Sequence, residues 1–335
     1  MSLGATMRRR DFIRVFGSAA AWPLAARAQQ AGRLPRIGFL SDQSERPHPF
    51  NARDYFLKRL YELGYQDQHN MVIDYRYAAG ELNRLPVLAS ELAALPVDVL
   101  IAIGTPASKA ALAATGKIPI VFSRVADPVA SGLVTSLAHP SGNATGTTVI
   151  TSDLAEKRLA LLKETVPRVN RIGVLHEKDF QPGDAELKQL ISAAPRLGLK
   201  IHAVAVAPPL AATLNAALGE IAEASVEALF IGSSGWFEDL YQNTLELANK
   251  SRLPALYVRP EFVRAGGLMS YGPDWGQMYG IAADYVVRIV KGAKPPELPV
   301  QQPTTLKLLI NLSAAKAIGL NVPPTLIARA DEVID

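Results

Sequence analysis

The sequence predicts an α/β protein of two lobes, each with a parallel sheet covered by helices on both faces. The first observation is that short β-rich apolar runs alternate with amphipathic helical stretches from residue 36 onward. Such alternation is typical of parallel strands joined by helical crossovers. The second is that the strand motifs of the first half return in the same order in the second half. The third is that segments rich in Gly and Pro divide the halves and predict a hinge that the chain crosses more than once.

The first half shows the alternation element by element. Strands are expected over residues 36–40, 71–77, 98–103 and 118–122, and helices over residues 52–63, 85–95 and 107–115. The helix over 52–63 places its apolar side chains at helical spacings, and Pro96 ends the helix over 85–95. The strands over 98–103 and 118–122 are almost wholly apolar, which indicates burial on both faces of the sheet.

Three strand motifs of the first half recur in the second half. RIGFL at 36–40 is matched by RIGVL at 171–175, VDVLIAIG at 97–104 by VEALFIG at 226–232, and IPIVF at 118–122 by LPALY at 253–257. Any two α/β units share Val- and Ile-rich strands followed by glycine, and this is the alternative explanation. The common order of three matches favours two similarly folded halves that face one another.

The expected lobe boundaries follow from the breaker-rich segments. Residues 139–146 contain Pro and two Gly, and Gly272-Pro273 marks a second crossing. A helix is expected over 277–291, a strand over 306–311 and a short helix over 314–318. We therefore expect an N-terminal lobe of residues 34–145 plus 273–302 and a C-terminal lobe of residues 146–272 plus 303–335. Several crossings make a hinge, and hinged lobes close around a ligand.

Residues 1–28 resemble an export signal of the twin-arginine type. Three consecutive arginines, Arg8 to Arg10, precede a short apolar run that ends in the small-residue pattern Ala26-Arg27-Ala28. The alternative is an N-terminal helix of the domain. A signal peptide predicts a protein that works in a bacterial periplasm.

Composition restricts the classes of function. The leader holds five arginines and one aspartate, so its net charge is +4. This equals the net charge of the whole chain, and the remaining 307 residues are therefore close to neutral. An electrostatic basis for binding nucleic acid or an anionic membrane is therefore missing. The chain has no cysteine, which excludes disulfides, thiol catalysis and a lipid-anchored cysteine. With no later apolar run of membrane-spanning length, stable membrane insertion is not expected.

Ligands of parallel α/β sheets bind beyond the carboxyl ends of the strands, and this rule selects the candidate site residues. In the first half they are Ser41, Asp42, Gly104, Thr105, Ser123 and Asp127. In the second half they are Lys178, Asp179, Gly232, Ser233, Ser234, Trp236, Tyr257, Arg259 and Glu261, with Tyr271 and Asp274 at the hinge.

Gly104-Thr105-Pro106 is the sharpest of these features. A buried strand ends in glycine, then a hydroxyl, then proline at the first position of a helix. The free N–H groups and positive dipole of such a helix start suit a carboxylate. Thr105 either touches the ligand or caps the helix. Ser233 and Ser234 are the counterparts in the second half.

The other candidates have ordinary structural alternatives. Asp127 either pairs with a ligand ammonium or bonds to its own turn, and Asp274 either contacts the ligand or caps the following helix. Trp236 offers an aromatic face or belongs to the core. The remaining aromatic candidates, which are expected to wall an apolar slot or to pack normally, are Phe50, Tyr257 and Tyr271.

The sequence contains no recognisable catalytic or cofactor motif. The five histidines are scattered without metal-ligand spacing, and no nucleophile elbow, phosphate-binding loop or dinucleotide fingerprint occurs. We therefore expect a protein that holds a small polar molecule without converting it, with no metal and no cofactor.

Short motifs form an ordered set along residues 36–335. They are GTPA (104–107), IPIVF (118–122), DPV (127–129), GLV (132–134), GNATG (142–146), SYG (270–272), KGAKP (291–295), INL (310–312), AK (315–316) and ARADEV (328–333). This set resembles the ABC-transporter substrate-binding proteins, a family that includes tryptophan-binding components. The resemblance implies two Rossmann-like lobes of the type I periplasmic binding protein fold, and delivery of a small organic solute to a permease and its ATPase.

The resemblance also implies roles for individual residues. In relatives that bind amino acids, helix N-termini and hydroxyls hold the carboxylate, an acidic side chain holds the amine, and aromatic side chains stack on the ligand. Carried over, the carboxylate role falls on Thr105, Ala107, Ser233 and Ser234, the amine role on Asp127, and the stacking role on Trp236 and Tyr271. The leader departs from the lipoprotein signals of many relatives.

The function expected from the sequence is therefore that of a monomeric periplasmic solute-binding protein. Its solute would be a small carboxylate-bearing molecule, amino-acid-like or aromatic, held between the lobes. The alternatives are a sensory protein that presents ligand to a chemoreceptor or histidine kinase, and an exported two-lobed enzyme. A DNA-binding regulator is excluded, because residues 1–35 are too short and too hydrophobic for a helix-turn-helix.

Overall fold

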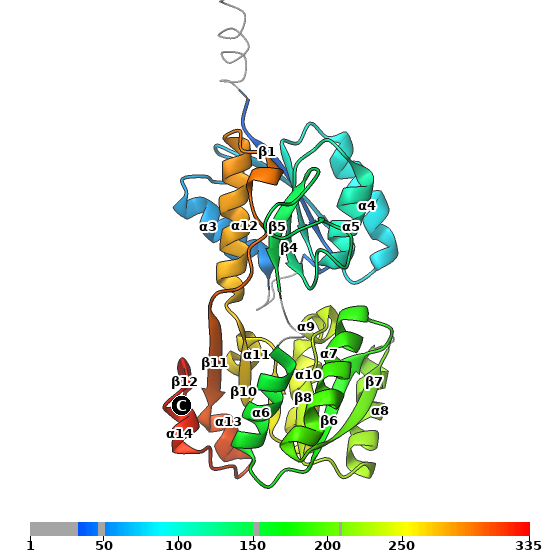
Figure 1. Cartoon of the computed structure of the whole chain (residues 1–335), viewed down its shortest axis with the longest axis vertical. Helices are drawn as coiled ribbons and strands as arrows, with labels where there is room; N and C mark the ends of the chain where they lie inside the picture. The colour runs from blue at the N-terminus through cyan, green and yellow to red at the C-terminus, as the bar shows by residue number, and fades with distance from the viewer. Residues whose placement is uncertain (1–32, 46–50, 150–153, 208–209) are drawn as a thin grey trace, which may run out of the picture.

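The polypeptide forms two α/β lobes stacked along the long axis of the molecule, as the computed structural model shows (Figure 1). The structure describes residues 33–45, 51–149, 154–207 and 210–335. The expected leader (residues 1–28) and the candidate Phe50 lie outside the described residues. The two sheets are separate, so each lobe has a core of its own.

The first lobe is built on a five-stranded parallel sheet of order β2-β1-β3-β4-β5. Its strands are β1 (Arg36–Ser41), β2 (Val72–Tyr77), β3 (Val99–Ile103), β4 (Ile120–Val125) and β5 (Ala144–Thr148). Its helices are α3 (Ala52–Glu62), α4 (Leu85–Ala94), α5 (Thr105–Ala114) and α12 (Trp275–Val290), with 3-10 turns η2 (Leu82–Arg84) and η5 (Pro295–Glu297). Helices α3 and α12 cover one face of the sheet, and α4 and α5 cover the other (Figure 1).

Helix α12 belongs to the first lobe although it comes late in the sequence. Asp274 caps it by accepting a hydrogen bond from the Gln277 backbone N–H at 3.1 Å. Its apolar face packs against α3, where the Tyr55 and Tyr279 rings stack with centroids 5.9 Å apart. This late helix brings Trp275, at its first position, to the edge of the first lobe that faces the second.

The second lobe is built on a seven-stranded sheet of order β12-β11-β10-β9-β8-β6-β7. Its strands are β6 (Arg171–Glu177), β7 (Lys200–Val206), β8 (Ala228–Ile231), β9 (Ala255–Tyr257), β10 (Met269–Pro273), β11 (Leu306–Asn311) and β12 (Glu332–Ile334). Its helices are α6 (Ala155–Thr165), α7 (Gln181–Ala193), α8 (Leu210–Glu223), α9 (Gly235–Asp239), α10 (Tyr241–Ser251), α11 (Pro260–Arg264), α13 (Leu312–Ala317) and α14 (Pro324–Ile327), with a 3-10 turn η4 (Ala194–Leu197). The pairing is parallel except between β10 and β11, which run antiparallel because the chain returns from the first lobe before it forms β11.

The chain passes between the lobes after β5, after β10 and after η5 (Figure 1). The expected divisions at residues 145/146 and 272/273 fall inside β5 and β10, because each strand continues its sheet beyond the breaker residues. The segments of the first and third passes run side by side where they leave the first lobe, because Gln301 forms an isolated parallel bridge with Thr147. We propose lobes of 34–148 plus 274–302 and 149–273 plus 303–335.

A buried ion pair ties together four segments of the second lobe. The Arg158 guanidinium donates to Glu186 at 2.8 Å and to the Tyr271 carbonyl at 2.7 Å, and both charged side chains are almost wholly buried. The second oxygen of Glu186 accepts a hydrogen bond from the Ser233 backbone N–H at 2.7 Å. The pair therefore fixes the position of the loop after β8 through the hydrogen bond from Ser233 to Glu186.

We predict that Arg158→Leu lowers the free energy of unfolding by about 3–5 kcal/mol, because it leaves the Glu186 carboxylate buried without its partner. Replacing both residues by leucine should recover most of the loss. The control is Arg196→Leu, whose ion pair with Glu156 is more than half exposed and should contribute about 0–1 kcal/mol. Urea denaturation measures the free energy of unfolding of the two single variants and of the double variant. Equal losses for Arg158 and Arg196 would contradict the assignment.

Candidate functional site

A cavity lies between the lobes, where the carboxyl ends of the strands of both sheets meet. It is lined by Asp42, Gln43, Gly80, Leu82, Gly104, Thr105, Pro106, Arg124, Ala126 and Val149, by Glu177, Phe180, Ser233, Ser234, Gly235, Trp236, Glu238, Asp239 and Val258, and by Trp275. Its volume of about 90 Å³ is small beside ligand sites of roughly 300–1,000 Å³. A solute of amino-acid size therefore needs a wider separation of the lobes.

Arg124 enters the cavity because β4 is irregular at its end. The register with β5 shifts between Phe122 and Val125, and Arg124 lies in the left-handed region with φ +60°. A bulge of this kind bends a strand and redirects a side chain. The Arg124 guanidinium donates to the Asp42 carboxylate, and both side chains are largely buried. This pairing offsets the backbone strain of a left-handed non-glycine residue.

Gly104 makes room for this pair. Its φ is +95°, which L side chains rarely adopt, and a Cβ atom there would overlap the Asp42 carboxylate and lie 2.9 Å from an Arg124 nitrogen. Gly104 also precedes α5, so the start of this helix borders the cavity. The Gly104 carbonyl accepts the Ser108 hydroxyl at 2.7 Å. Glycine at this position is therefore required for both the backbone conformation and the space.

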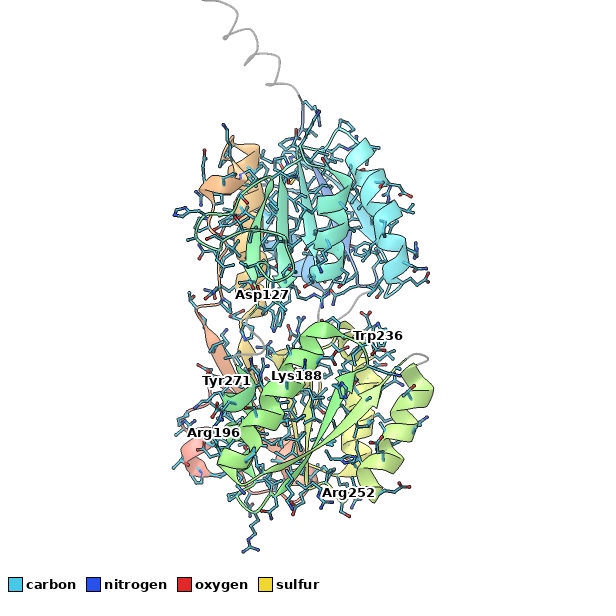
Figure 2. The ribbon with its side chains drawn as sticks, turned by 45° about the vertical axis from the view of Figure 1, so that its right-hand side comes forward. Asp127, Lys188, Arg196, Trp236, Arg252 and Tyr271 are labelled. Carbon is cyan, nitrogen blue, oxygen red and sulfur yellow. The ribbon has the colours of Figure 1, made fainter. Side chains whose placement is uncertain are left out.

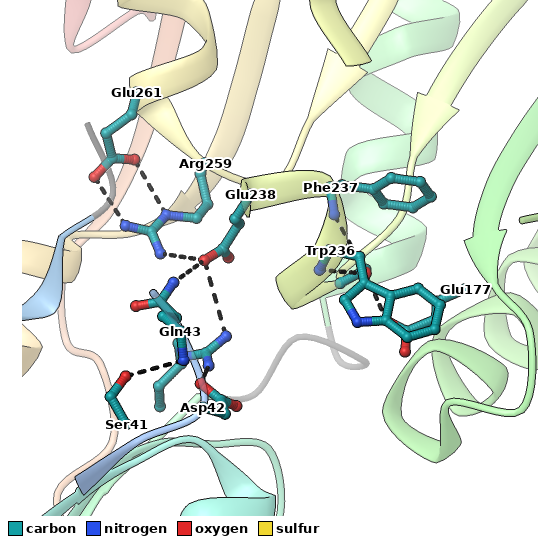
Figure 3. Close-up of polar contacts among 11 residues, drawn as sticks. Ser41, Asp42, Gln43, Glu177, Trp236, Phe237, Glu238, Arg259 and Glu261 are labelled. Atoms are coloured by element: carbon teal, nitrogen blue, oxygen red, sulfur yellow. Dashed lines mark hydrogen bonds and ion pairs between the residues drawn. The ribbon is translucent and has the colours of Figure 1, made fainter. Parts of the chain in front are cut away.

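Glu238, on α9 of the second lobe, joins the two lobes through its Oε2 atom (Figure 3). From the first lobe it accepts a hydrogen bond from Gln43 at 3.1 Å and lies 3.8 Å from an Arg124 nitrogen. From its own lobe it receives the Arg259 guanidinium at 3.0 Å. We call Asp42, Arg124, Glu238 and Arg259 the inter-lobe ion network.

Arg259 is fully buried and is held on three sides. Its guanidinium donates to Glu261 at 3.2 and 3.1 Å as well as to Glu238. It also stands 4.4 Å from the centre of the Trp275 ring, which belongs to the first lobe. Burial by itself lowers the pKa of Arg259, but Glu238 and Glu261 outweigh burial and raise the pKa well above its ordinary value. The Tyr55 hydroxyl adds a bond across the lobes to Glu261 at 3.3 Å.

Carboxyl groups outnumber guanidinium groups on the cavity wall. The ionisable lining side chains are Asp42, Glu177, Glu238 and Asp239 against Arg124. Burial raises the pKa of Asp42, although Arg124 lowers it, and burial also raises the pKa of Glu177. Burial and the neighbouring Glu238 raise the pKa of Asp239 to about 7. The wall is thus acidic, and burial favours the protonated form of Asp42, Glu177 and Asp239.

Six of the sequence-predicted residues lie on the cavity wall. They are Asp42, Gly104, Thr105, Ser233, Ser234 and Trp236. Ser234 caps α9 by accepting from the Trp236 N–H at 3.0 Å and donates its hydroxyl to Glu177 at 2.5 Å. Trp236 faces the gap between the lobes (Figure 2). Thr105 is not the cap of α5, because Gly104 occupies the cap position.

Six further predicted residues lie outside the lining, each with another structural role. Asp127 is exposed and accepts from the Val129 and Ala130 N–H groups at 3.0 and 2.9 Å, so it closes its own turn. Asp274 caps α12 and pairs with Lys307 at 2.5 Å. The remaining four are Ser41, whose hydroxyl accepts the Gln43 N–H; Ala107, in the core of the first lobe; Tyr257, stacked on Phe262; and Tyr271, packed on the core of the second lobe.

The sequence reasoning missed most of the charged wall. Asp42, Arg259 and Glu261 were candidates at strand ends, but Gln43, Arg124, Glu177, Glu238, Asp239 and Trp275 were not selected. Gln43 and Glu177 obey the same strand-end rule and could have been found with it. Arg124 depends on a bulge and Trp275 on a helix that returns from the second lobe, and neither leaves a signal in local sequence.

The described part of the chain offers neither a metal-ligand cluster nor a membrane-spanning helix. Within it, no group of three or more His, Asp or Glu side chains is arranged to hold a metal ion. No helix in residues 33–45, 51–149, 154–207 or 210–335 is long and apolar enough to cross a membrane.

The chain matches a known family over most of its length. A family model described as ABC transporter substrate binding protein covers residues 44–334. The chain belongs to this family. Members of the family bind substrates and are not enzymes, so this chain is a substrate-binding protein and not an enzyme.

Known relatives share the family and the fold. The tyrosine-binding protein of Clostridioides difficile is 26% identical over 281 residues, which cover 84% of this chain and 80% of the relative. A conserved domain protein from Vibrio cholerae is 28% identical with a TM-score of 0.81, over 90% of this chain and 100% of that chain. A Streptococcus pneumoniae ABC domain in complex with L-Trp is 25% identical with a TM-score of 0.79, again over 90% and 100%. The predicted fold of type I periplasmic binding proteins is thereby confirmed.

We predict that Gly104→Ala destabilises the protein by about 1–3 kcal/mol, because the new methyl group meets the Asp42–Arg124 pair at a strained φ. Chemical denaturation measures the loss. The control is Gly116→Ala, at a glycine with open space around it and no positive φ, which should be neutral or slightly stabilising. A similar loss in both variants would refute the steric argument.

We also predict that Glu238→Ala opens the ligand-free protein, because it removes the acceptor shared by Gln43, Arg124 and Arg259. The radius of gyration from small-angle X-ray scattering should increase relative to the unsubstituted protein. Glu246→Ala, which removes an exposed carboxylate of the same lobe, should leave it unchanged. An unaltered radius in Glu238→Ala would show that other contacts hold the lobes together.

Proposed function

We propose that this protein is the extracytoplasmic solute receptor of an ABC uptake transporter, and that it binds an amino-acid-like aromatic solute between its lobes. The observation that carries the proposal is the cavity at the meeting point of both sets of strand ends. Such a position lets one ligand contact both lobes, so that binding energy closes the hinge. A permease and its ATPase would then receive the solute from the closed form.

The aromatic nature of the solute is supported by the apolar part of the wall. Phe180 and Trp236 from the second lobe and Trp275 from the first contribute three aromatic rings to one cavity. Flat aromatic walls favour a flat apolar ligand, and each stacked pair contributes about 0.5–1.5 kcal/mol beyond area burial. The tyrosine-binding relative and the L-Trp complex fit the same class of solute.

Polar groups on the wall suit a ligand with an oxygen acceptor. The Trp275 indole N–H and the Arg124 Nε–H are buried and have no acceptor among the described residues. A buried donor without a partner costs about 1–3 kcal/mol, so a ligand oxygen that accepts from it gains affinity. Thr105, at the start of α5, lies beside these groups on the wall.

The export of the protein is part of the proposal. The twin-arginine-like segment at residues 1–28 and the family's role both fit a periplasmic location. A monomer suffices for the function, because the site is complete within one chain.

The test is calorimetric titration with L-tyrosine and L-tryptophan, together with mass spectrometry of any solute that co-purifies with the exported protein. We predict that Trp236→Ala and Thr105→Val weaken binding about tenfold or more, since each removes a wall group of the cavity. Tyr257→Phe and Asp127→Asn serve as matched controls, because the structure places both residues off the wall. Full affinity in the wall variants, or equal losses in the controls, would refute the location of the site.

A further inference from the structure

The charges of the cavity wall do not balance. Arg124 already pairs with Asp42 and lies 3.8 Å from Glu238. Arg259, behind the wall, is divided between Glu238 and Glu261. Two guanidinium groups thus serve three carboxylates, and neither is left over for an anionic group on a ligand.

Two more wall carboxyls form no ion pair with a described lysine or arginine, and Arg124 acts on them only from beyond ion-pair distance. Glu177 accepts the Ser234 hydroxyl, and no described lysine or arginine lies within ion-pair distance of it. The Asp239 side chain receives no hydrogen bond from any residue in the described ranges and is half-buried. Carboxylates withdrawn from water without a counter-charge are costly, and a positive group between them would lower that cost.

The aromatic part of the wall points independently to the same ligand class. Trp275 is 4% exposed, lines the cavity, and holds an indole N–H with no acceptor among the described residues. Its ring already carries the Arg259 guanidinium at 4.4 Å, so one cation–π contact is built into this wall. Phe180 and Trp236 offer further rings, and aromatic walls beside carboxylates are a known way to hold organic ammonium groups.

We infer that the cavity selects a ligand of net positive charge, an aromatic amine with a neutral oxygen acceptor, over a zwitterionic amino acid or an organic acid. The ammonium group lies toward Glu177 and Asp239, and the apolar body lies against Trp236 and Phe180. The oxygen accepts from the Trp275 N–H. This inference rests on the proposed function, because it specifies the charge of the solute that the inter-lobe site takes.

Binding of a cation is then coupled to proton release from the wall. The groups that face Asp239 are Glu238 on its own helix and Asp42 and Arg124 from the first lobe, and together with burial they raise the pKa of Asp239 to about 7. A cationic ligand favours the ionised carboxylate. Its affinity therefore rises as the pH increases through 7 and falls below it, whereas an organic acid would bind more weakly as the wall ionises.

The experiment compares three probes that share a 4-hydroxyphenyl group and differ in the amine and carboxylate that set their net charge: tyramine, L-tyrosine and 4-hydroxyphenylpropionate. Each carries the same phenol, and calorimetry at pH 8 and pH 5.5 measures the affinities. At pH 8 we expect tyramine to bind at least about tenfold more tightly than tyrosine. The affinity for tyramine should fall at pH 5.5, and the acid should show no binding. Tyrosine binding as tightly as tyramine, or the acid binding at all, would overturn the inference.

Variants separate the charge of the wall from its shape. Asp239→Asn and Glu177→Gln keep the side-chain size and should each weaken tyramine binding about tenfold while leaving tyrosine less affected. Asp239→Asn should also reduce the pH dependence. Glu246→Gln, an exposed carboxylate elsewhere on the second lobe, is the control and should leave both affinities unchanged. Unchanged tyramine affinity in both wall variants would overturn the inference.

The outcomes distinguish this inference from the proposed function. Tyrosine binding that is at least as tight as tyramine binding and is lost in Trp236→Ala supports the function and overturns the charge preference. If none of the probes binds, the net charge of the co-purifying solute decides: a cation supports the inference, and a neutral or anionic solute overturns it. Failure of every probe with no co-purifying solute overturns both.

Discussion

The two lobes meet through buried charges, and the rest of the site depends on this contact. Glu238 of the second lobe is held by Gln43 and Arg124 of the first and by Arg259 of its own. Removing such groups from water is costly unless each finds a partner, so the apposed form is favourable only while the network is complete. Because the contact is polar, its groups can be hydrated when the lobes separate. A large apolar interface would not allow this, and the charged contact is therefore compatible with a working hinge.

The two-sheet architecture places these charged residues in one cavity without long loops. Parallel strands direct their carboxyl ends to one edge of each sheet, and the two edges face one another. Asp42 and Glu177 lie at the ends of their strands, on this edge. The bulge at Arg124 and the absence of a side chain at Gly104 leave room for the Arg124 guanidinium beside Asp42. Helix α12 adds Trp275 from a segment that has already passed through the second lobe. The site is thus assembled from regions that lie far apart in the chain.

Most of the fold was predictable from the sequence, for reasons visible in particular elements. The strand predicted over 306–311 matches β11, and the helix predicted over 52–63 matches α3 within one residue. These segments have strong apolar periodicity and clear breakers at their ends. The boundary near 145 was less accurate, because the short strand β5 consists of Ala, Thr and Gly and carries little periodic signal.

The sequence by itself determined the α/β class, the doubled arrangement and the family, because these depend on local patterns and on ordered motifs. Only the tertiary structure decided which polar groups share the cavity. Asp127 closes its own turn and Tyr257 packs in the core, whereas Arg124 and Glu238 meet across the lobes, although all four are similar in local sequence terms. The reason is physical: whether a polar group serves its neighbours in the chain or a distant partner depends on backbone geometry and lobe packing, and neither is encoded in adjacent residues.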